Sequence, residues 1–287
     1  MKPIQDRILH IVLVIAAIAL AIMPFSAYGH DIEDGFAKIF LKIVDRLMPQ
    51  PPPEEHRKLI GPVEALRVPI FIYHSVRPHA PEETSLLRHY IVGPDSFENQ
   101  LNYLKENDYT VISMDRLASS LYAGEQLPPK AVVLTFDDGW ENQYRYAFPL
   151  LQKYDFTGTF YIFTNAIGHK NFLTWEQVIA MDQAGMDIGG HTRSHPFLTK
   201  IISLDGLRAE IVNGKEDIER HLHKIVRNFA YPFGQYNDMV ISIVREAGYK
   251  TARSTYIGTR HTLDDIHQLR AVEATDDMNK FVRDLNQ

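Results

Sequence analysis

Two pairs of side chains in this chain are of the types that bind metal ions and move protons. Asp137 and Asp138 follow an apolar run that begins at Ala131, and Gly139 after them marks a turn. Two adjacent carboxylates at the end of a buried strand repel each other and lose hydration, a cost that a cation or a shared proton relieves. His191 and His195 lie four residues apart, which places both imidazoles on the same side of one helical turn.

Together the two pairs indicate a metal site with a spare carboxylate beside it. Neutral imidazole is a good ligand for zinc and similar ions, and two histidines with one carboxylate leave positions open for water and substrate. Asp138 is the natural third ligand, and Asp137 then stays free to take a proton from water. A histidine pair alone is more often a surface or core feature, but here both pairs follow predicted strands. We expect a divalent metal, Zn²⁺ first, with Co²⁺ or Ni²⁺ as alternatives.

From about Arg67 onward, strand patterns alternate with helix patterns. The predicted strands cover 68–73, 110–113, 131–136, 157–163, 186–190, 227–231, 249–253 and 268–272. The predicted helices cover 95–106, 114–122, 141–153, 174–184, 204–224, 238–247 and 276–285, with Thr174 and Ser203 as the N-caps of two of them. Such alternation predicts an α/β fold with a mostly parallel sheet, and this number of strands favours a closed or nearly closed (β/α) barrel. Because sites in parallel barrels lie at the strand C-termini, both pairs and the turn Pro232-Phe233-Gly234 should converge.

The N-terminal part has the layout of an export signal. Lys2 and Arg7 precede an apolar run from Ile11 to Met23, and small residues suit cleavage after Gly29. An uncleaved membrane anchor over 8–25 is the alternative. We therefore expect 1–29 to be a signal peptide or anchor, and the remaining chain to be periplasmic, extracellular or held at the outer face of a membrane.

Residues 30–66 are expected to join this segment to a single catalytic domain over 67–287. An amphipathic helix over 30–48 either packs on its own domain or lies on a membrane surface, and a Pro-rich linker starts at Pro51. The 287 residues have no cysteine, which excludes disulfides and thiol catalysis. Their net charge of -6 argues against a nucleic-acid partner.

On the basis of these residues, the region 67–287 resembles the polysaccharide deacetylases, the NodB-homology group of carbohydrate esterases. Thr-Phe-Asp-Asp-Gly, ending at Gly139, matches the first motif of the family, and His191-Thr192-Arg193-Ser194-His195 matches the second. The resemblance implies a distorted parallel (β/α) barrel of about seven to eight strands. It also implies that Asp137 is the general base and that Asp138, His191 and His195 bind the metal.

The third motif departs from the family pattern. Many members have Arg-x-Pro-Tyr-Gly, whereas Ala230 stands here in the place of the arginine that orients the catalytic aspartate. Arg270, near the last predicted strand, is the candidate replacement, although a surface arginine paired with an acid is the ordinary case. Phe233 aligns with the residue whose backbone N–H helps to hold the oxyanion.

The C-terminal Leu-x-His motif, which supplies the acid in many members, is absent. The run from Ile70 to Val76 resembles the first strand of a subgroup that acts on biofilm poly-N-acetylglucosamine, so the acid role carries onto His74. A histidine that merely caps the barrel mouth is the alternative.

These features lead to one leading hypothesis and two alternatives. The leading hypothesis is a metal-dependent hydrolase that removes N-acetyl groups from an extracellular or cell-wall polysaccharide containing N-acetylglucosamine. An O-acetyl esterase acting on xylan or a similar glycan would have the same metal site. A non-catalytic glycan-binding protein is the third possibility, but it has no need of the complete Asp-Asp-His-His set.

Overall fold

The computed structural model describes residues 65–287, and their architecture is built on parallel strands. The predicted signal or anchor over 1–29 and the predicted helix over 30–48 lie outside the described residues. Among the helices of residues 65–287, none is long and apolar enough to cross a membrane.

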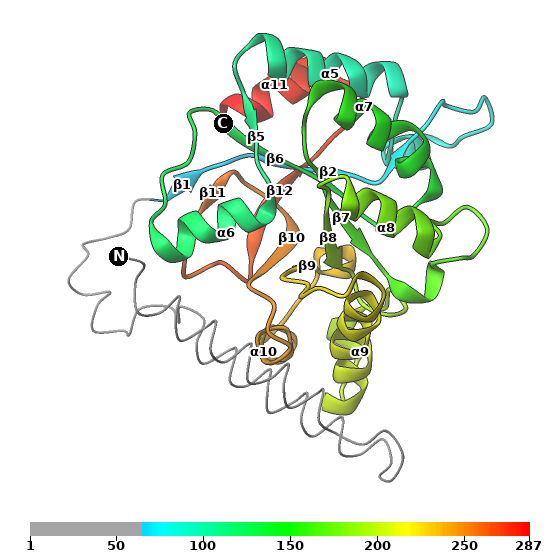
Figure 1. The fold of residues 1–287 in the computed structure, drawn as a ribbon, viewed down its shortest axis with the longest axis vertical. Coiled ribbons are helices and arrows are strands. Elements are labelled where there is room, and N and C mark those ends of the chain that lie inside the picture. Colours follow the sequence, from blue (N-terminus) through cyan, green and yellow to red (C-terminus); the bar gives the residue numbers. More distant parts are fainter. Residues whose placement is uncertain (1–64) are drawn as a thin grey trace, which may run out of the picture. The chain divides into compact units, whose positions relative to one another are not determined.

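Seven parallel strands close into a barrel, as the sequence pattern predicts (Figure 1). Around the ring they run in the order β2, β12, β10, β9, β8, β7 and β6, and β6 pairs with β2 to close it. The ring strands are β2 (Ile70–Tyr73), β6 (Ala131–Phe136), β7 (Thr159–Ile162), β8 (Asp187–Gly190), β9 (Asn228–Ala230), β10 (Thr251–Ile257) and β12 (Leu269–Glu273).

Five short strands lie outside the ring. One of them, β5, pairs with the start of β6, β1 pairs antiparallel with β11, and β3 pairs with β4. Their bounds are β1 (Leu66–Arg67), β3 (Ser75–Val76), β4 (Ile91–Val92), β5 (Thr110–Val111) and β11 (Arg260–His261).

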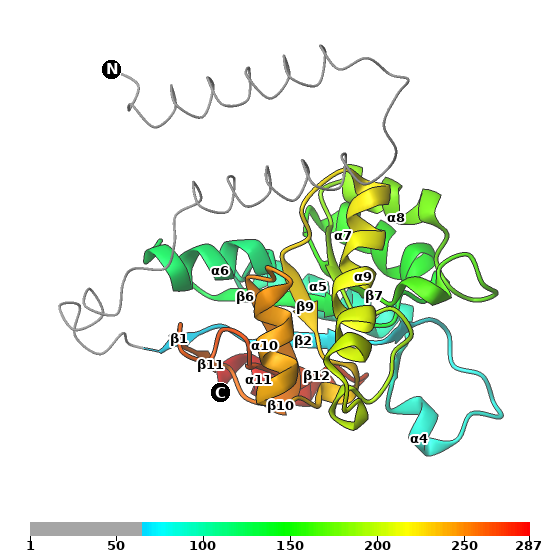
Figure 2. The same ribbon diagram turned by 90° about the horizontal axis from the view of Figure 1, so that it is seen from below.

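Helices surround the barrel and agree with the predicted ranges to within a few residues at each end (Figures 1 and 2). The α-helices are α4 (Ser85–Arg88), α5 (Pro94–Glu106), α6 (Met114–Ala123), α7 (Phe148–Tyr154), α8 (Trp175–Gln183), α9 (Leu204–Leu222), α10 (Asp238–Glu246) and α11 (Met278–Asn286). The predicted caps are present: Thr174 forms a capping box with Gln177, and Ser203 accepts a hydrogen bond from the Gly206 N–H.

One predicted helix, 141–153, is two elements. It begins with a π-helical turn, η1 (Gln143–Ala147), and continues as α7. Single π-helical turns occur frequently at functional sites. This one aims the Gln143 side chain at the barrel, where its amide nitrogen donates to the backbone carbonyls of His74, at 2.6 Å, and Asp137, at 2.5 Å. The turn therefore ties the ends of β2 and β6 together.

Strand alternation decides which residues enter the barrel. In β6, Val132, Leu134 and Phe136 pack outward against the helices. Ala131 and Val133 belong to a second apolar cluster, which includes Tyr161 of β7 and Ala230 of β9. Successive side chains of a strand point to opposite faces, so Asp137, two residues after Thr135, continues the inner row.

Candidate metal centre and active site

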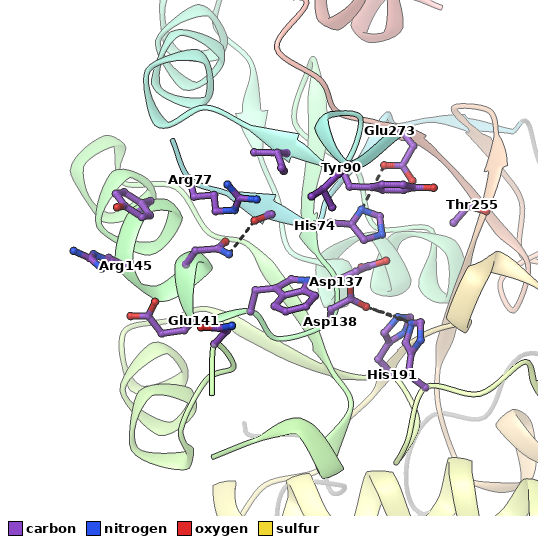
Figure 3. Close-up of a pocket in the computed structure, with 18 of the residues that line it drawn as sticks. His74, Arg77, Tyr90, Asp137, Asp138, Glu141, Arg145, His191, Thr255 and Glu273 are labelled. Atoms are coloured by element: carbon purple, nitrogen blue, oxygen red, sulfur yellow. Dashed lines mark hydrogen bonds and ion pairs between the residues drawn. The ribbon is translucent and has the colours of Figure 1, made fainter. Parts of the chain in front are cut away.

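All six site residues predicted from the sequence line one pocket of about 880 Å³ at the C-terminal end of the barrel (Figure 3). They come from four segments that follow ring strands: His74 follows β2, Asp137 and Asp138 follow β6, His191 and His195 follow β8, and Phe233 follows β9. The parallel strands place these segments together because their carboxyl ends all reach the same end of the barrel.

Asp138 leaves the strand with its carboxylate turned toward the histidines. Its backbone is left-handed, with φ of 75°, and φ of Gly139 is 72°. The Trp140 indole N–H donates to Oδ2 of Asp138 at 3.1 Å. This hydrogen bond leaves Oδ1 to face Nε2 of His191 at 3.5 Å and Nε2 of His195 at 3.3 Å.

The two histidines present their Nε2 atoms to the same point, 3.1 Å apart. Nδ1 of His191 donates to the Ala230 carbonyl at 2.7 Å, so the neutral ring carries its lone pair on Nε2. Ligand atoms 2.0–2.2 Å from a tetrahedral ion lie about 3.3–3.6 Å from one another. The three separations, from 3.1 to 3.5 Å, suit a small ion, and among the described residues no other such cluster of potential ligands occurs.

The charge states in the cluster also suit metal binding. Burial lowers the pKa of His195 to about 4, with His191 acting in the same direction, so its imidazole is neutral near pH 7. Burial alone would raise the pKa of Asp138, but its hydrogen bond to His191 and the charges of the nearby histidines hold it well below its ordinary value. The site therefore offers an ionised carboxylate at Asp138 and a neutral imidazole at His195, the forms that ligate metals.

Asp137 is buried and is held by an arginine inside the barrel. Nη2 of Arg253 contacts both carboxylate oxygens of Asp137, with a distance of 2.6 Å to Oδ2. The Asp137 backbone N–H also donates to the Tyr73 carbonyl at 2.8 Å. The ion pair with Arg253 fixes the orientation of the Asp137 carboxylate beside Asp138.

The prediction that Arg270 replaces the missing motif arginine is wrong. Arg270 is exposed, and its guanidinium donates to the Ile257 carbonyl at 3.4 Å. Arg253 takes the position instead, from β10, where it lies in register with Ala230 of β9. The Arg253 guanidinium thus comes from the strand next to β9. Ala230, which stands where the family motif has its arginine, lies beside Arg253 in the sheet.

Sequence reasoning missed Arg253, although one signal was available. Arg253 ends the predicted strand 249–253, and an arginine at a buried strand position requires a partner. Arg253 is fully buried and also lies over the Tyr161 ring, at 5.2 Å from its centroid.

His74 lies across the pocket from the histidine pair. Its Nδ1 faces Oε2 of Glu273 at 3.6 Å, and its ring packs edge-on against Tyr90 (Figure 3). Burial would lower the pKa of His74, but Glu273 and the negative charges of Asp137 and Asp138 outweigh it and raise the pKa to about 9. His74 is therefore a cation near neutral pH, with a proton to give.

Phe233 is in the turn η4 (Pro232–Gly234), with φ of 58°. Its ring stacks on Phe197 at 3.9 Å between centroids and contacts the His195 ring edge-on at 4.7 Å. The side chain covers the outer side of the histidine pair, and its backbone follows β9 at the mouth of the barrel.

Comparison with known proteins agrees with this geometry. The family model described as polysaccharide deacetylase matches residues 124–252. The chain carries a polysaccharide deacetylase domain. The matched residues include Asp137, Asp138 and both histidines. The domain is therefore that of a hydrolase.

Relatives of this deacetylase domain share its sequence at moderate identity. YxkH of Bacillus subtilis is 28% identical over 218 residues, which are 74% of this chain and 73% of that protein. A poly-beta-1,6-N-acetyl-D-glucosamine N-deacetylase of Staphylococcus aureus is 26% identical over 177 residues, which are 57% of this chain and 61% of the relative. The chain therefore spans less than two thirds of the length of that enzyme.

Solved structures show the same domain. The deacetylase PplD of Streptococcus pyogenes, solved in complex with acetate, superposes with a TM-score of 0.72 and 29% identity. That alignment covers 77% of this chain and 99% of PplD. The closed barrel described above is therefore the fold of this family.

Replacing Arg253 tests the buried ion pair. In Arg253→Met, the Asp137 carboxylate remains in the barrel without its counter-charge, so the free energy of unfolding should fall by about 3–5 kcal/mol. Urea unfolding followed by circular dichroism measures this change. Arg270→Met is the matched control, expected within about 0.5 kcal/mol of wild type because Arg270 is on the surface. Equal stability of the two variants would contradict the assignment.

Proposed function

We propose that the protein is a metal-dependent N-deacetylase of an extracellular polysaccharide that contains N-acetylglucosamine. The observation that supports this most is the division of the two adjacent carboxylates. Asp138 faces two imidazole nitrogens, and Asp137 is held apart on Arg253. A metal site with a separate, ionised carboxylate beside it is what hydrolysis by an activated water requires.

Asp138, His191 and His195 would hold the metal, for which Zn²⁺ is the first candidate and Co²⁺ or Ni²⁺ are alternatives. When bound there, a divalent ion polarises the acetamide carbonyl and acidifies the attacking water. Asp137 accepts the proton of that water, and Arg253 holds the carboxylate in the orientation that this step needs. The backbone N–H of Phe233 donates to the oxyanion that forms.

His74 protonates the leaving amine. An amine is a poor leaving group unless it is protonated, so amide cleavage depends on an acid more than ester cleavage does. The ion pair with Glu273 keeps a proton on His74 near neutral pH. This favours N-acetyl over O-acetyl groups, and the presence of a charged acid and an ionised base argues against a purely glycan-binding role.

The relatives support the choice of polymer. The Staphylococcus aureus relative is named for poly-beta-1,6-N-acetyl-D-glucosamine, and PplD holds acetate, the product that deacetylation releases. We propose the same class of substrate here, in a biofilm or cell-wall polymer. The apolar N-terminal sequence, with basic residues before it, supports export, with release into the periplasm or medium or retention at the membrane.

Asp137→Asn tests the assigned base. The variant should retain stoichiometric metal, because Asp137 contacts Arg253 and not the histidines, yet lose at least about 100-fold in acetate release. Metal content by mass spectrometry and acetate release from poly-N-acetylglucosamine, chitin, peptidoglycan and acetylated xylan fragments measure the two quantities, each with and without a chelator. Release at the wild-type rate would exclude Asp137 as the base, and release from xylan alone would point to the O-acetyl esterase.

Glu273→Gln tests the acid. His74 must be protonated to act, so activity should be present below its pKa and be lost as pH rises through it. Since Glu273 raises that pKa, the glutamine variant should lose activity at a lower pH than wild type. The pH profile of kcat/KM measures the alkaline limb. If the alkaline limb of the kcat/KM profile is the same in Glu273→Gln as in wild type, another group donates the proton.

A further inference from the structure

The loop that carries the two histidines has a backbone that must be held in place. Thr192 and His195 are both left-handed, with φ of 72° and 58°. Non-glycine residues in this region cost on the order of 1 kcal/mol each and persist where the surroundings determine the conformation. Within the loop, the His195 backbone N–H donates to Oγ1 of Thr192 at 2.9 Å. With this single internal hydrogen bond, the loop conformation depends on contacts with the elements packed against the loop.

Helix α9 supplies one set of these contacts through Glu210. Oε2 of Glu210 accepts the backbone N–H groups of Arg193 at 3.2 Å and Ser194 at 2.8 Å. Oε1 accepts the Ser194 hydroxyl at 2.6 Å. One carboxylate therefore binds both residues immediately before His195, and hydrogen bonds to an ionised acceptor are the stronger kind.

Gly214 allows the same helix to lie against the loop. It follows Glu210 by four residues, so both are on one face of α9. A Cβ atom added at Gly214 would lie 2.9 Å from the Thr192 carbonyl carbon and 3.1 Å from the Arg193 nitrogen. Any side chain there would push the loop away from the helix.

The opposite side of the loop is held by backbone bonds. The N–H groups of Thr164 and Asn165, both in η2 (Thr164–Ala166), donate to the carbonyls of Thr192 at 3.3 Å and Arg193 at 2.8 Å. The loop is thus clamped between η2 and α9, and Glu210 is the only side chain of α9 with a hydrogen bond to it among the described residues.

We propose that Glu210 is a positioning residue for the metal centre, with Gly214 setting the distance of its helix. By fixing Arg193 and Ser194, the Glu210 carboxylate holds His195 at the separation from His191 and Asp138 that an ion requires. The inference rests on the proposed metal site. It adds that Glu210 of α9, which lies outside the family motifs, partly determines the affinity of the site for its metal.

The test is metal binding by the apo form of the full chain. Zn²⁺ is titrated calorimetrically into wild type, Glu210→Ala, Glu210→Gln and the control Glu216→Ala, which alters an exposed carboxylate on the same helix. Glu210→Ala should bind Zn²⁺ at least about tenfold more weakly. Glu210→Gln should bind almost as wild type does, because its amide oxygen can accept both N–H groups and its NH₂ can donate to the Ser194 hydroxyl. The control should match wild type.

Melting temperatures of the apo forms separate positioning from general stability. If Glu210→Ala melts lower yet binds Zn²⁺ with wild-type affinity, the inference is overturned. If that variant does not fold, Gly214→Ala replaces it: weaker Zn²⁺ binding supports the inference and unchanged affinity overturns it. Failure of wild type to bind Zn²⁺, or binding by His191→Ala with wild-type affinity, would instead overturn the proposed metal centre.

Discussion

The site depends on giving two adjacent carboxylates different partners. Strand alternation turns Asp137 into the barrel, where Arg253 neutralises it, and the left-handed turn at Asp138 sends the next carboxylate toward the histidines. A buried ion pair contributes little net stability, because desolvation of both charges offsets their attraction. The Asp137–Arg253 pair is therefore better understood as a functional arrangement than as a stabilising one.

The other parts of the site follow from the same arrangement. His191 is oriented by the Ala230 carbonyl, on the strand that neighbours Arg253, and Trp140 fixes the second oxygen of Asp138. Left-handed non-glycine residues occur at Asp138, within the His191–His195 loop and at Phe233, so the strand ends that form the site carry backbone strain. Strain of this kind persists only where neighbouring elements hold it. Here η1, η2 and α9 do so.

Much of the fold and the site could be predicted from the sequence because periodicity and short motifs are local signals. The ring strands, the caps at Thr174 and Ser203, and the convergence of six site residues all follow from them. Arg253 could not be assigned in this way, since its relation to Ala230 is a lateral register between strands that no linear motif contains. The short elements β3, α4 and β4 were also missed, because two to four residues carry no periodicity.

The most direct test of the account is anomalous diffraction at the zinc edge from crystals of the Zn²⁺-loaded protein. The account predicts one fully occupied ion, with Oδ1 of Asp138 and Nε2 of His191 and His195 at about 2.0–2.2 Å. It also predicts that the Asp137 carboxylate stays on Arg253, outside the ligand shell. Direct coordination of the ion by Asp137, or an anomalous peak away from these three residues, would contradict the division of roles between the two carboxylates.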